Sequence, residues 1–498
     1  MNPAPKIIGG SLLAILVLVG LLSWNPRRGA DRTPGRPLLV YCAAGLKGPV
    51  AQVARDYERR TGIPVQLQYG GSGLLLSNLR VARRGDLYLA ADHTYLDAGR
   101  SNGLVAEVLP LARMRAVIAV PAGNPRRIQS AADLEAAPLQ LGWANVESTA
   151  VGRLSQSVLK TAGLWEAIFP RIKVFKPTVN DVANDVKLGA VDAGVVWDAT
   201  LVDYPELEAV AAPELEPAEA GVAVGVLTFS EQPTEALRFA RFLGARDAGL
   251  PVFSRAGFRV VAGDQWSERP EVVLYSGGVN RIAIEESLRE FEAREGVSVT
   301  RVYNGCGILT AQIRSGQRPD AYFACDVSFM TTVAAHFEPP TDLSETRMVL
   351  LTQPGNPRDL RILADLAKPG LAIGVANEQQ SALGALTARL LRAEGLFDAV
   401  MANVRVQTPT ADLLVNQLRA GGLDAVVVYA ANTRQVRDLL TVIELPQEAA
   451  LAIQPYAVGR DSNNAHLMER LLEWLKSGTS RRRFEDSGFR WRAVGEAP

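Results

Sequence analysis

The sequence predicts two consecutive α/β units that follow a short apolar segment at the N-terminus. Three observations support this prediction. The chain has 498 residues, which is enough for two to four domains. Motifs of the first half recur in the second half at a nearly constant spacing. Within each half, short apolar runs typical of buried strands alternate with amphipathic helical patterns, as they do in open α/β sheets.

Composition excludes several classes of protein. The chain has 53 basic and 53 acidic residues and no formal net charge, so it lacks the basic excess of a dedicated nucleic-acid binder. Its content of 48% hydrophobic and 21% charged residues is that of a globular protein. Three cysteines and three histidines are too few for a disulfide scaffold or for zinc- or histidine-based catalysis. We therefore expect no metal, no cofactor and no nucleic-acid partner.

The N-terminal segment has 18 consecutive uncharged residues, Ile7–Trp24. This is about the shortest run that spans a bilayer as a helix. The residues that end it, Leu21–Pro26, do not resemble the small-residue cleavage site of a secretory signal. We expect residues 1–36 to form an uncleaved anchor and spacer, with the rest on the periplasmic or extracytoplasmic face; a cleaved signal is the alternative. Arg27 and Arg28 run against this orientation under the positive-inside rule.

The repeat consists of whole motifs that occur once in each half of the chain. The spacing is 234 residues early in each unit and 232 residues later, which indicates duplication of a large globular unit. The matched pairs include Tyr69–Gly73 with Tyr303–Gly307, Asp86–Asp92 with Asp320–Asp326, Gly123–Arg126 with Gly355–Arg358, Pro177-Thr178 with Pro409-Thr410, and Asp192–Trp197 with Asp424–Tyr429. We expect units at 37–262 and 271–492, a linker at 263–270 and a tail at 493–498. The short polar linker leaves little room for independent motion.

Strands and helices are expected to alternate in each unit, with ligands bound at the turns that lead from strands into helices. The first helix has a buried stripe of Val50, Val53, Ala54 and Tyr57 and stops at Gly62. Expected elements also include strands at Leu38–Tyr41, Pro64–Gln68, Leu139–Ala144 and Val272–Tyr275, a helix from Ser72 to Arg80, a helix at Asn464–Lys476, and a solvated turn at Ser477–Arg483.

Three turns carry the candidate site of the first unit: Ala43–Lys47, Gly70–Gly73 and Glu147–Gly152. Glycines allow close approach of a ligand, and free amides with the helix dipole attract an anion at a helix start. For one turn alone, helix capping is the simpler interpretation. Three such turns, each with a counterpart in the second unit, predict a binding site.

These motifs resemble, in the same order, those of periplasmic molybdate-binding proteins of ABC transporters. The segments that carry the resemblance are VYCAAGLKG, TGIPVQLQYGGSGLLLSNL, GDLYLAAD, ESTAVGRLSQSVLKTAGLW and VDAGVVWDAT. The resemblance covers about residues 37–262 and, more weakly, 270–492. It implies the type II periplasmic-binding-protein fold, in which two α/β lobes joined by a hinge close over a ligand. The lobes of the first unit are then expected at 37–112 with 213–262 and at 113–212, and the second unit is expected to split near Thr346 and Leu445.

The resemblance also implies ligand-binding positions. The family holds a tetrahedral oxyanion with neutral donors, which correspond here to Gly45, Ser72, the amide of Val151, and Trp197. Gly45 and Trp197 lack the hydroxyls of the family's serine and tyrosine. The full set of candidates is Gly45, Lys47, Ser72, Ser148, Thr149, Val151 and Trp197 in the first unit, and Cys306, Arg281, Ser381 and Tyr429 in the second.

The implied function is that of a solute-binding protein, not an enzyme, which captures a small oxyanion similar to molybdate or tungstate for an ABC permease. Two alternatives stay open. The segment VVLYSGG also resembles the opening of ferric-iron-binding proteins, so Tyr275, Tyr303, Tyr429 and Cys306 suggest iron or another anion in the second unit. The chain also fits a membrane-anchored sensory or scaffold protein with a degenerate second unit. Because Cys306 and Arg281 change the donors of the second unit, we expect the two units to differ in ligand or affinity.

Overall fold

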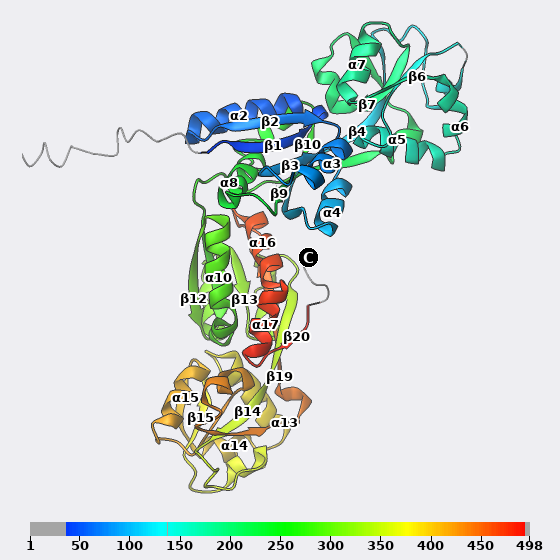
Figure 1. The fold of residues 1–498 in the computed structure, drawn as a ribbon. Helices are drawn as coiled ribbons and strands as arrows, with labels where there is room; N and C mark the ends of the chain where they lie inside the picture. The colour runs from blue at the N-terminus through cyan, green and yellow to red at the C-terminus, as the bar shows by residue number, and fades with distance from the viewer. Residues whose placement is uncertain (1–35, 137, 494–498) are drawn as a thin grey trace, which may run out of the picture.

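The computed structural model describes residues 36–136 and 138–493. Two α/β units lie end to end in an elongated, bent arrangement, with the first unit at the top of Figure 1 and the second below it. The expected anchor, Ile7–Trp24, lies outside the described residues. Among the residues that are described, no helix has the length and apolar character needed to cross a bilayer.

The first unit alternates strands and helices, as the sequence predicts. Its elements in chain order are β1 (Leu38–Ala43), α2 (Lys47–Thr61), β2 (Val65–Gly70), α3 (Ser72–Ala82), β3 (Leu87–Ala90), α4 (Thr94–Ser101), β4 (Val105–Pro121), β5 (Leu141–Ala144), α5 (Ala150–Thr161), α6 (Trp165–Ile168), β6 (Ile172–Lys176), α7 (Val179–Lys187), β7 (Ala193–Trp197), β8 (Leu207–Val210), β9 (Glu219–Leu227), α8 (Pro233–Leu243), α9 (Leu250–Arg255) and β10 (Arg259–Val260).

The second unit repeats this order. Its elements are β11 (Glu271–Gly277), α10 (Arg281–Glu295), β12 (Ser298–Asn304), α11 (Cys306–Arg314), β13 (Ala321–Phe323), α12 (Val327–Thr331), β14 (Thr341–Thr352), β15 (Ile373–Ala376), α13 (Ala382–Ala393), α14 (Phe397–Met401), β16 (Val404–Thr408), α15 (Ala411–Arg419), β17 (Ala425–Tyr429), β18 (Thr441–Glu444), β19 (Leu451–Val458), α16 (Ala465–Leu475), α17 (Gly478–Asp486) and β20 (Arg490–Trp491).

Strand order is the same in both units. It runs β2-β1-β3-β9-β4-β7-β5-β6 in the first unit and β12-β11-β13-β19-β14-β17-β15-β16 in the second. Every strand of one path has its repeat partner at the same place in the other path. The duplication inferred from motifs therefore extends to the complete topology.

The two lobes of each unit are separate bodies in Figure 1, but their strands form one hydrogen-bonded path. The reason is a long crossover strand that pairs in both lobes. In the first unit, Val105–Arg115 of β4 pairs with β9, and Ala116–Pro121 pairs with β7 and β8. In the second unit β14 does the same with β19, β17 and β18. Each unit therefore has two lobes that share one long strand.

Local sequence explains where the helices begin and end. The predicted stripe of α2 is buried, and the helix ends at Gly62, whose φ of 76° places it in the left-handed region that favours glycine. The equivalent helix α10 ends in the same way at Gly296, with a φ of 66°. Because parallel strands β1 and β2 are followed by helices on the same edge, the starts of α2 and α3 lie near one another.

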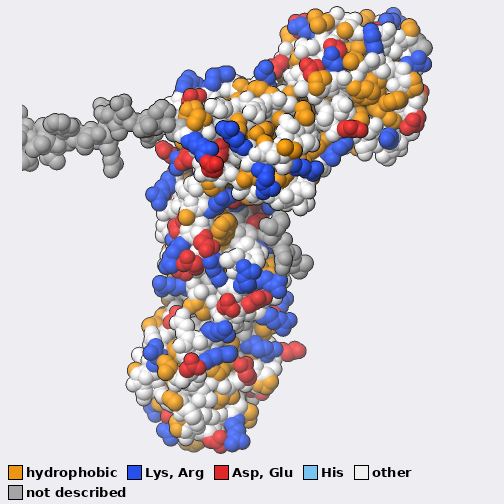
Figure 2. Space-filling model, in the orientation of Figure 1, with side chains coloured by type: hydrophobic (Ala, Val, Ile, Leu, Met, Phe, Trp, Pro, Cys, Tyr) orange, Lys and Arg blue, Asp and Glu red, His pale blue; other side chains and the backbone are white. Residues whose placement is uncertain are grey.

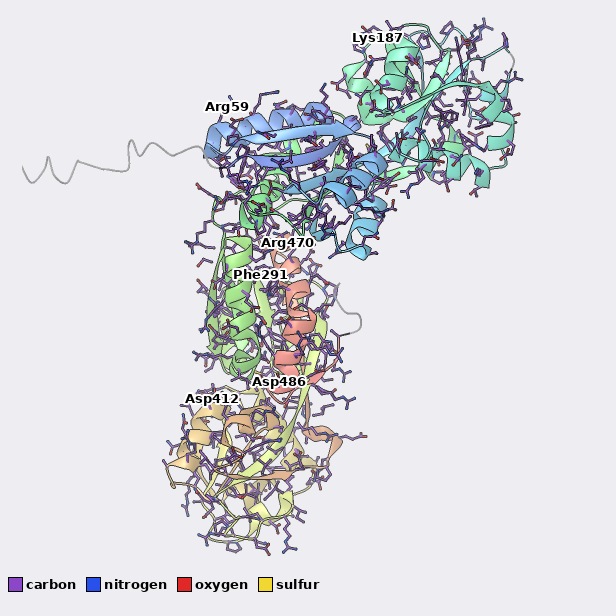
Figure 3. The ribbon with its side chains drawn as sticks, in the orientation of Figure 1. Arg59, Lys187, Phe291, Asp412, Arg470 and Asp486 are labelled. Atoms are coloured by element: carbon purple, nitrogen blue, oxygen red, sulfur yellow. The ribbon has the colours of Figure 1, made fainter. Side chains whose placement is uncertain are left out.

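The two units are joined by a buried ionic cluster. Arg241 of α8 donates to the Glu295 carboxylate at 2.8 Å, and Arg470 of α16 donates to the same carboxylate at 2.7 Å. Arg470 is labelled at this junction in Figure 3. Nearby, Arg294 pairs with Glu107 at 2.7 Å. In the linker, Asp264 accepts hydrogen bonds from two amides at the start of α16. These contacts connect the units more firmly than the linker alone.

Candidate functional site

Backbone hydrogen bonds to one carbonyl group join the two lobes of each unit. In the first unit the amide of Gly73 donates to the carbonyl of Ser148 at 2.9 Å, and in the second unit Gly307 donates to Gln380 at 3.0 Å. Glycine is required beside this contact. A Cβ on Gly71 would lie 2.4 Å from the Ser148 carbonyl oxygen, which is closer than Cβ atoms approach oxygen. Both clefts are therefore in a closed state that only small residues permit.

A small cavity of about 20 Å³ lies in the closed cleft of the first unit. Five of the seven predicted residues of this unit line it: Gly45, Ser72, Thr149, Val151 and Trp197. Lys47 and Ser148 do not. The Lys47 side chain is exposed and its Nζ lies 5.5 Å from the centre of the Tyr69 ring, while the Ser148 hydroxyl donates to Asn145 at 3.0 Å. The turns named from the sequence thus come together, although two of their polar side chains point elsewhere.

Three helices begin at this cavity, and only two of them were expected. Ser72 starts α3, and Ala150 and Val151 start α5. The third is α7, whose cap Thr178 and first residue Val179 also line the cavity. The repeated Pro-Thr pair at 177 and 409 was the available signal for this third turn. Because the first amides of a helix have no partner within the helix, three helix starts give the cavity a positive potential.

The hydroxyl groups around the cavity differ in whether their own proton is already donated to the protein. Thr149 caps α5 by accepting from the Gly152 amide, and its own proton goes to the Asn145 carbonyl. The Ser72 oxygen accepts a hydrogen bond from the Ala91 amide at 3.1 Å. No acceptor among the described residues takes the proton of Ser72. The proton of this hydroxyl is therefore available to a ligand in the cavity.

Trp197 and Gly45 define the remaining wall of the cavity. Trp197 ends β7 and is buried. A Cβ on Gly45 would lie 3.3 Å from the Trp197 ring and 3.2 Å from Val179. The large Trp197 indole thus occupies the space beside Gly45 that a side chain at this position would need. None of the described residues that line this cavity is charged.

The second cleft has a cavity of similar size at the equivalent place, also about 20 Å³. Of the four predicted residues, Ser381 and Tyr429 line it. Cys306 lies directly beneath, with its sulfur 2.7 Å from that of Cys325, a lining residue. Arg281 does not line the cavity; its guanidinium is exposed and lies 5.5 Å from the Tyr303 ring centre.

The second cleft also contains an acidic group that the sequence reasoning missed. Asp412 lines the cavity and accepts a hydrogen bond from Asn432 at 3.0 Å; the label in Figure 3 places it on the side of its lobe that faces the other lobe. Partial removal from water raises the pKa of this carboxyl group, and Asn432 and Arg281 only partly offset the effect. The equivalent residue of the first unit is Asn180, 232 positions earlier. Comparing the residue just inside each helix would have revealed this difference in charge.

Two more oxygen atoms in this cleft have no partner among the described residues. The Tyr429 hydroxyl and the Asn432 Oδ1 are buried without a hydrogen bond. Burial raises the pKa of Tyr429 well above its ordinary value. The Tyr429 hydroxyl therefore keeps its proton and can donate, whereas Asn432 Oδ1 and the Asp412 carboxylate accept, and an acidic side chain is absent from the lining of the first cavity in the described residues.

The three tyrosines considered for iron do not gather in this cleft. Tyr429 lines the cavity, but the Tyr303 hydroxyl donates to Glu285 at 2.9 Å and Tyr275 packs in a separate apolar cluster with Leu309. Across residues 36–136 and 138–493, no three side chains of His, Cys, Asp or Glu are grouped as metal ligands.

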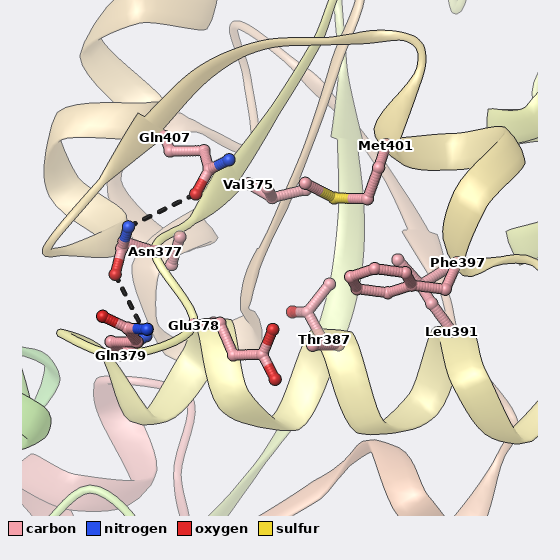
Figure 4. A pocket seen from close by; sticks show the side chains of 12 residues that line it. Val375, Asn377, Glu378, Gln379, Thr387, Leu391, Phe397, Met401 and Gln407 are labelled. Carbon is pink, nitrogen blue, oxygen red and sulfur yellow. Dashed lines mark hydrogen bonds between the residues drawn. The ribbon is translucent and has the colours of Figure 1, made fainter.

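A larger cavity of about 300 Å³ lies in the second lobe of the second unit, next to the start of α13 (Figure 4). Val375, Phe397, Met401 and Gln407 line it. The residues 232 positions earlier are Trp143, Trp165, Phe169 and Phe175. These four rings pack in a chain, with centroid distances of 5.4, 5.7 and 6.1 Å. The cavity is thus the space that aromatic side chains fill in the first unit.

Comparison with known proteins matches each unit separately. A family model described as "Bacterial extracellular solute-binding protein" matches residues 38–259 and again residues 272–490. Among curated proteins, a putative binding protein of Haemophilus influenzae is 28% identical over 222 residues, which cover 44% of this chain and 90% of that protein. The molybdate-binding protein ModA of Mycobacterium bovis is 26% identical over 227 residues, covering 44% and 84%.

Solved structures with a similar fold include the periplasmic molybdate-binding protein of Azotobacter vinelandii, at 17% identity and a TM-score of 0.40, covering 45% of this chain and all of that chain. Iron-bound HitA of Pseudomonas aeruginosa has 20% identity and a TM-score of 0.38, covering 47% of this chain and 89% of the other.

Proposed function

Because the chain belongs to the bacterial extracellular solute-binding protein family, with two copies of the family's unit in tandem, we propose that its first unit captures a small oxyanion. The solute class is that of molybdate and tungstate. The captured ion passes to an ABC permease on the extracytoplasmic face of the membrane.

One observation carries this proposal: the starts of α3, α5 and α7 converge on a small cavity that has no charged lining side chain among the described residues. Helix starts bind anions through free amides and through the helix dipole. The Ser72 hydroxyl adds a donor whose proton has no acceptor in the described protein. A cavity of about 20 Å³ holds little more than one water-sized group, so the lobes part to admit the ion and only a small solute fits.

The relatives support the same solute class. The ModA protein that is 26% identical to this chain is a molybdate-binding protein, and the match covers 84% of its length. A match that covers most of that protein but 44% of this chain corresponds to a single unit.

In the second unit, the side chains that line the cavity favour a different solute. Asp412 repels an anion, and the buried Asn432 Oδ1 needs a hydrogen-bond donor, although the Tyr429 hydroxyl can itself donate. We propose that this cleft excludes the oxyanion of the first unit and selects a solute that offers donors or positive charge.

The arrangement in the cell is part of the proposal. Residues 37–262 and 271–492 are the two solute-binding units, the linker spans 263–270, and Ile7–Trp24 tethers them to the membrane. The sequence at the N-terminus of the mature protein tests the tether: an intact segment in the membrane fraction is expected, and a mature protein that begins near residue 25–30 in the soluble fraction would contradict it.

The test of the binding proposal uses two matched glycine variants. Gly71→Ala and Gly305→Ala each place a Cβ within 2.4 Å of a carbonyl oxygen of the facing lobe, in the first and second cleft respectively. Calorimetry with molybdate, tungstate, sulfate and phosphate is expected to give one bound oxyanion per chain. Gly71→Ala is expected to weaken this binding by roughly tenfold or more, a loss of about 1.4 kcal/mol, and Gly305→Ala is expected to leave it unchanged. The opposite pattern would place the oxyanion in the second unit.

A further inference from the structure

Two cysteines touch each other beneath the second cleft. Cys306 is the first residue of α11, and Cys325 follows β13 at the same edge of the sheet. Their sulfur atoms lie 2.7 Å apart, and the Cys325 amide donates to the Cys306 sulfur at 3.1 Å. Cys306 is fully buried, while Cys325 is 5% exposed and lines the cavity. One sulfur of the pair therefore faces the cleft and can be reached from it when the lobes part.

The first unit has the same contact without sulfur. There the Ala91 amide donates to the Ser72 oxygen at the same distance of 3.1 Å. The residues 234 positions later are Cys325 and Cys306, so both members of the contact are cysteine in the second unit. A chance substitution at one position would change only one partner of this contact, whereas both partners differ between the two units.

A third position next to these two cysteines also differs between the units. Gly277 stands where the first unit has Ala43. A Cβ at Gly277 would lie 2.0 Å from the Cys325 sulfur and 3.0 Å from the Cys306 sulfur. The space that the methyl group of Ala43 occupies in the first unit is thus given to the two sulfur atoms in the second. Three coordinated differences create this dithiol.

We propose that Cys306 and Cys325 form a reversible disulfide that closes the floor of the second cleft. The family is extracellular, and thiol pairs in such compartments meet disulfide-bearing oxidants. In the first exchange, Cys325 forms a mixed disulfide with the oxidant and one thiol leaves with a proton. Cys306 then attacks the Cys325 sulfur, and the second thiol leaves with the other proton. The balance is two cysteine thiols and one disulfide oxidant giving one protein disulfide and two small thiols.

The environment of Cys306 suits the second step. Burial opposes its ionisation, but hydrogen bonds from the Cys325 thiol and amide outweigh burial and lower the pKa of Cys306. The pKa of Cys325 is raised, because its thiol donates to Cys306 and because it is buried. In the mixed disulfide the Cys325 sulfur has no proton to donate, but the Cys325 amide still donates to the Cys306 sulfur and stabilises its thiolate, which is the nucleophile of the second exchange. A bond of about 2.05 Å requires only a short further approach of the sulfurs.

The disulfide has two consequences for the second cleft. It ties the start of α11 to the second residue after β13, and it removes a thiol group from the lining of the cavity. Cys42, the third cysteine, is buried in the first unit and belongs to a different apolar core, so it serves as an internal reference thiol.

The test counts free thiols on the full chain. The protein is incubated with oxidised glutathione, freed of reagent, unfolded, alkylated with iodoacetamide and weighed by mass spectrometry. One alkyl group is expected, on Cys42, and three are expected after reduction. Peptide mapping is expected to link the peptide of Cys306 to that of Cys325. The reductant is expected to lower the melting temperature of the second unit by roughly 5–10 °C.

Two variants keep the result interpretable. Cys325→Ala restores the residue of the first unit and is expected to take two alkyl groups with or without reductant, with no effect of reductant on melting. Cys42→Ala is expected to take none after oxidation and two after reduction. Three alkyl groups on the oxidised wild-type chain, or a linkage that involves Cys42, would overturn the proposal.

Discussion

At the scale of single residues, the hydroxyl groups of the first cleft differ in where their protons go. Ser72 accepts from Ala91 and keeps its own proton for a ligand, whereas Thr149 and Ser148 give theirs to Asn145. The sequence reasoning identified all three hydroxyls, because they stand in turns that match between the units. It could not rank them, since the partner of each hydroxyl is set by the fold of the neighbouring chain. Asp412 was missed because it stands just inside a helix, beyond the turn motif.

Replacing Ser72 by alanine is expected to weaken oxyanion binding by about 1–3 kcal/mol, the usual effect of losing a hydrogen bond to a charged group. Calorimetry of the full chain measures this as a roughly 5- to 150-fold rise in Kd. Ser148→Ala is the matched control, because its hydroxyl donates to Asn145 and does not line the cavity. Equal affinity of wild type and Ser72→Ala, with the same melting temperature, would mean that Ser72 only supports the turn.

At the scale of elements, the order of strands and helices followed from apolar periodicity and from the repeat. The crossover strand β4 was not predicted as one 17-residue strand, because pairing in two lobes cannot be read from a single run of residues.

The segment Ser477–Arg483 was expected to be a solvated turn. This interpretation was wrong, because helix α17 begins at Gly478. Ser477 caps the helix by accepting from the Ser480 amide, and Phe484 buries its ring against Phe489 and Trp491. Burial of one aromatic residue outweighed the polar composition of the segment.

The cavity beside α13 leads to an element-scale prediction. Val375 occupies the place of Trp143, which is buried against Trp165 in the first unit. Val375→Trp is expected to fill part of the cavity of about 300 Å³ and to raise the free energy of unfolding of the second unit by about 0.5–2 kcal/mol, as cavity-filling changes commonly do. Denaturant unfolding measures the change. Val81→Trp, at a site that is 87% exposed, is the control and is expected to have little effect. A loss of stability in Val375→Trp would show that the space is shaped for something other than an aromatic ring.

At the scale of the whole molecule, two units act as one elongated body. The face shown in Figure 2 carries basic and acidic side chains interspersed, in keeping with a net charge of zero. At the junction between the units, in contrast, the charges are buried: the Glu295 side chain is 2% exposed and pairs with both Arg241 and Arg470. The short linker predicted close association of the units, but not this cluster, whose members are far apart in sequence.

Replacing Glu295 by alanine is expected to lower the free energy of unfolding by about 3–5 kcal/mol, because two buried guanidinium groups lose their partner. Glu290→Ala on the same helix is the control. Its carboxylate is 41% exposed beside Arg483, so a loss within about 1 kcal/mol is expected. Similar losses in both variants by urea unfolding would show that the buried cluster does not hold the units together.

The junction also predicts a dependence on pH. Burial opposes ionisation of Glu295, but Arg470 and Arg241 outweigh it and lower the pKa below the ordinary value of 4.5. A carboxyl group whose pKa is lower in the folded state stabilises it above the unfolded pKa, and this contribution is lost as pH falls below about 4.5. Wild type is therefore expected to lose stability on acidification in that range more steeply than Glu295→Ala. Parallel pH profiles of the two proteins would contradict this role.

The two clefts share one architecture but differ in chemistry, and we expect only the first to hold an oxyanion. The most direct measurement is anomalous X-ray scattering from crystals of the full chain grown with tungstate. We expect one strong tungsten peak between Gly45, Ser72 and Val151, and none between Val279, Cys325 and Tyr429. A peak of equal height in both clefts, or in the second cleft alone, would contradict the account.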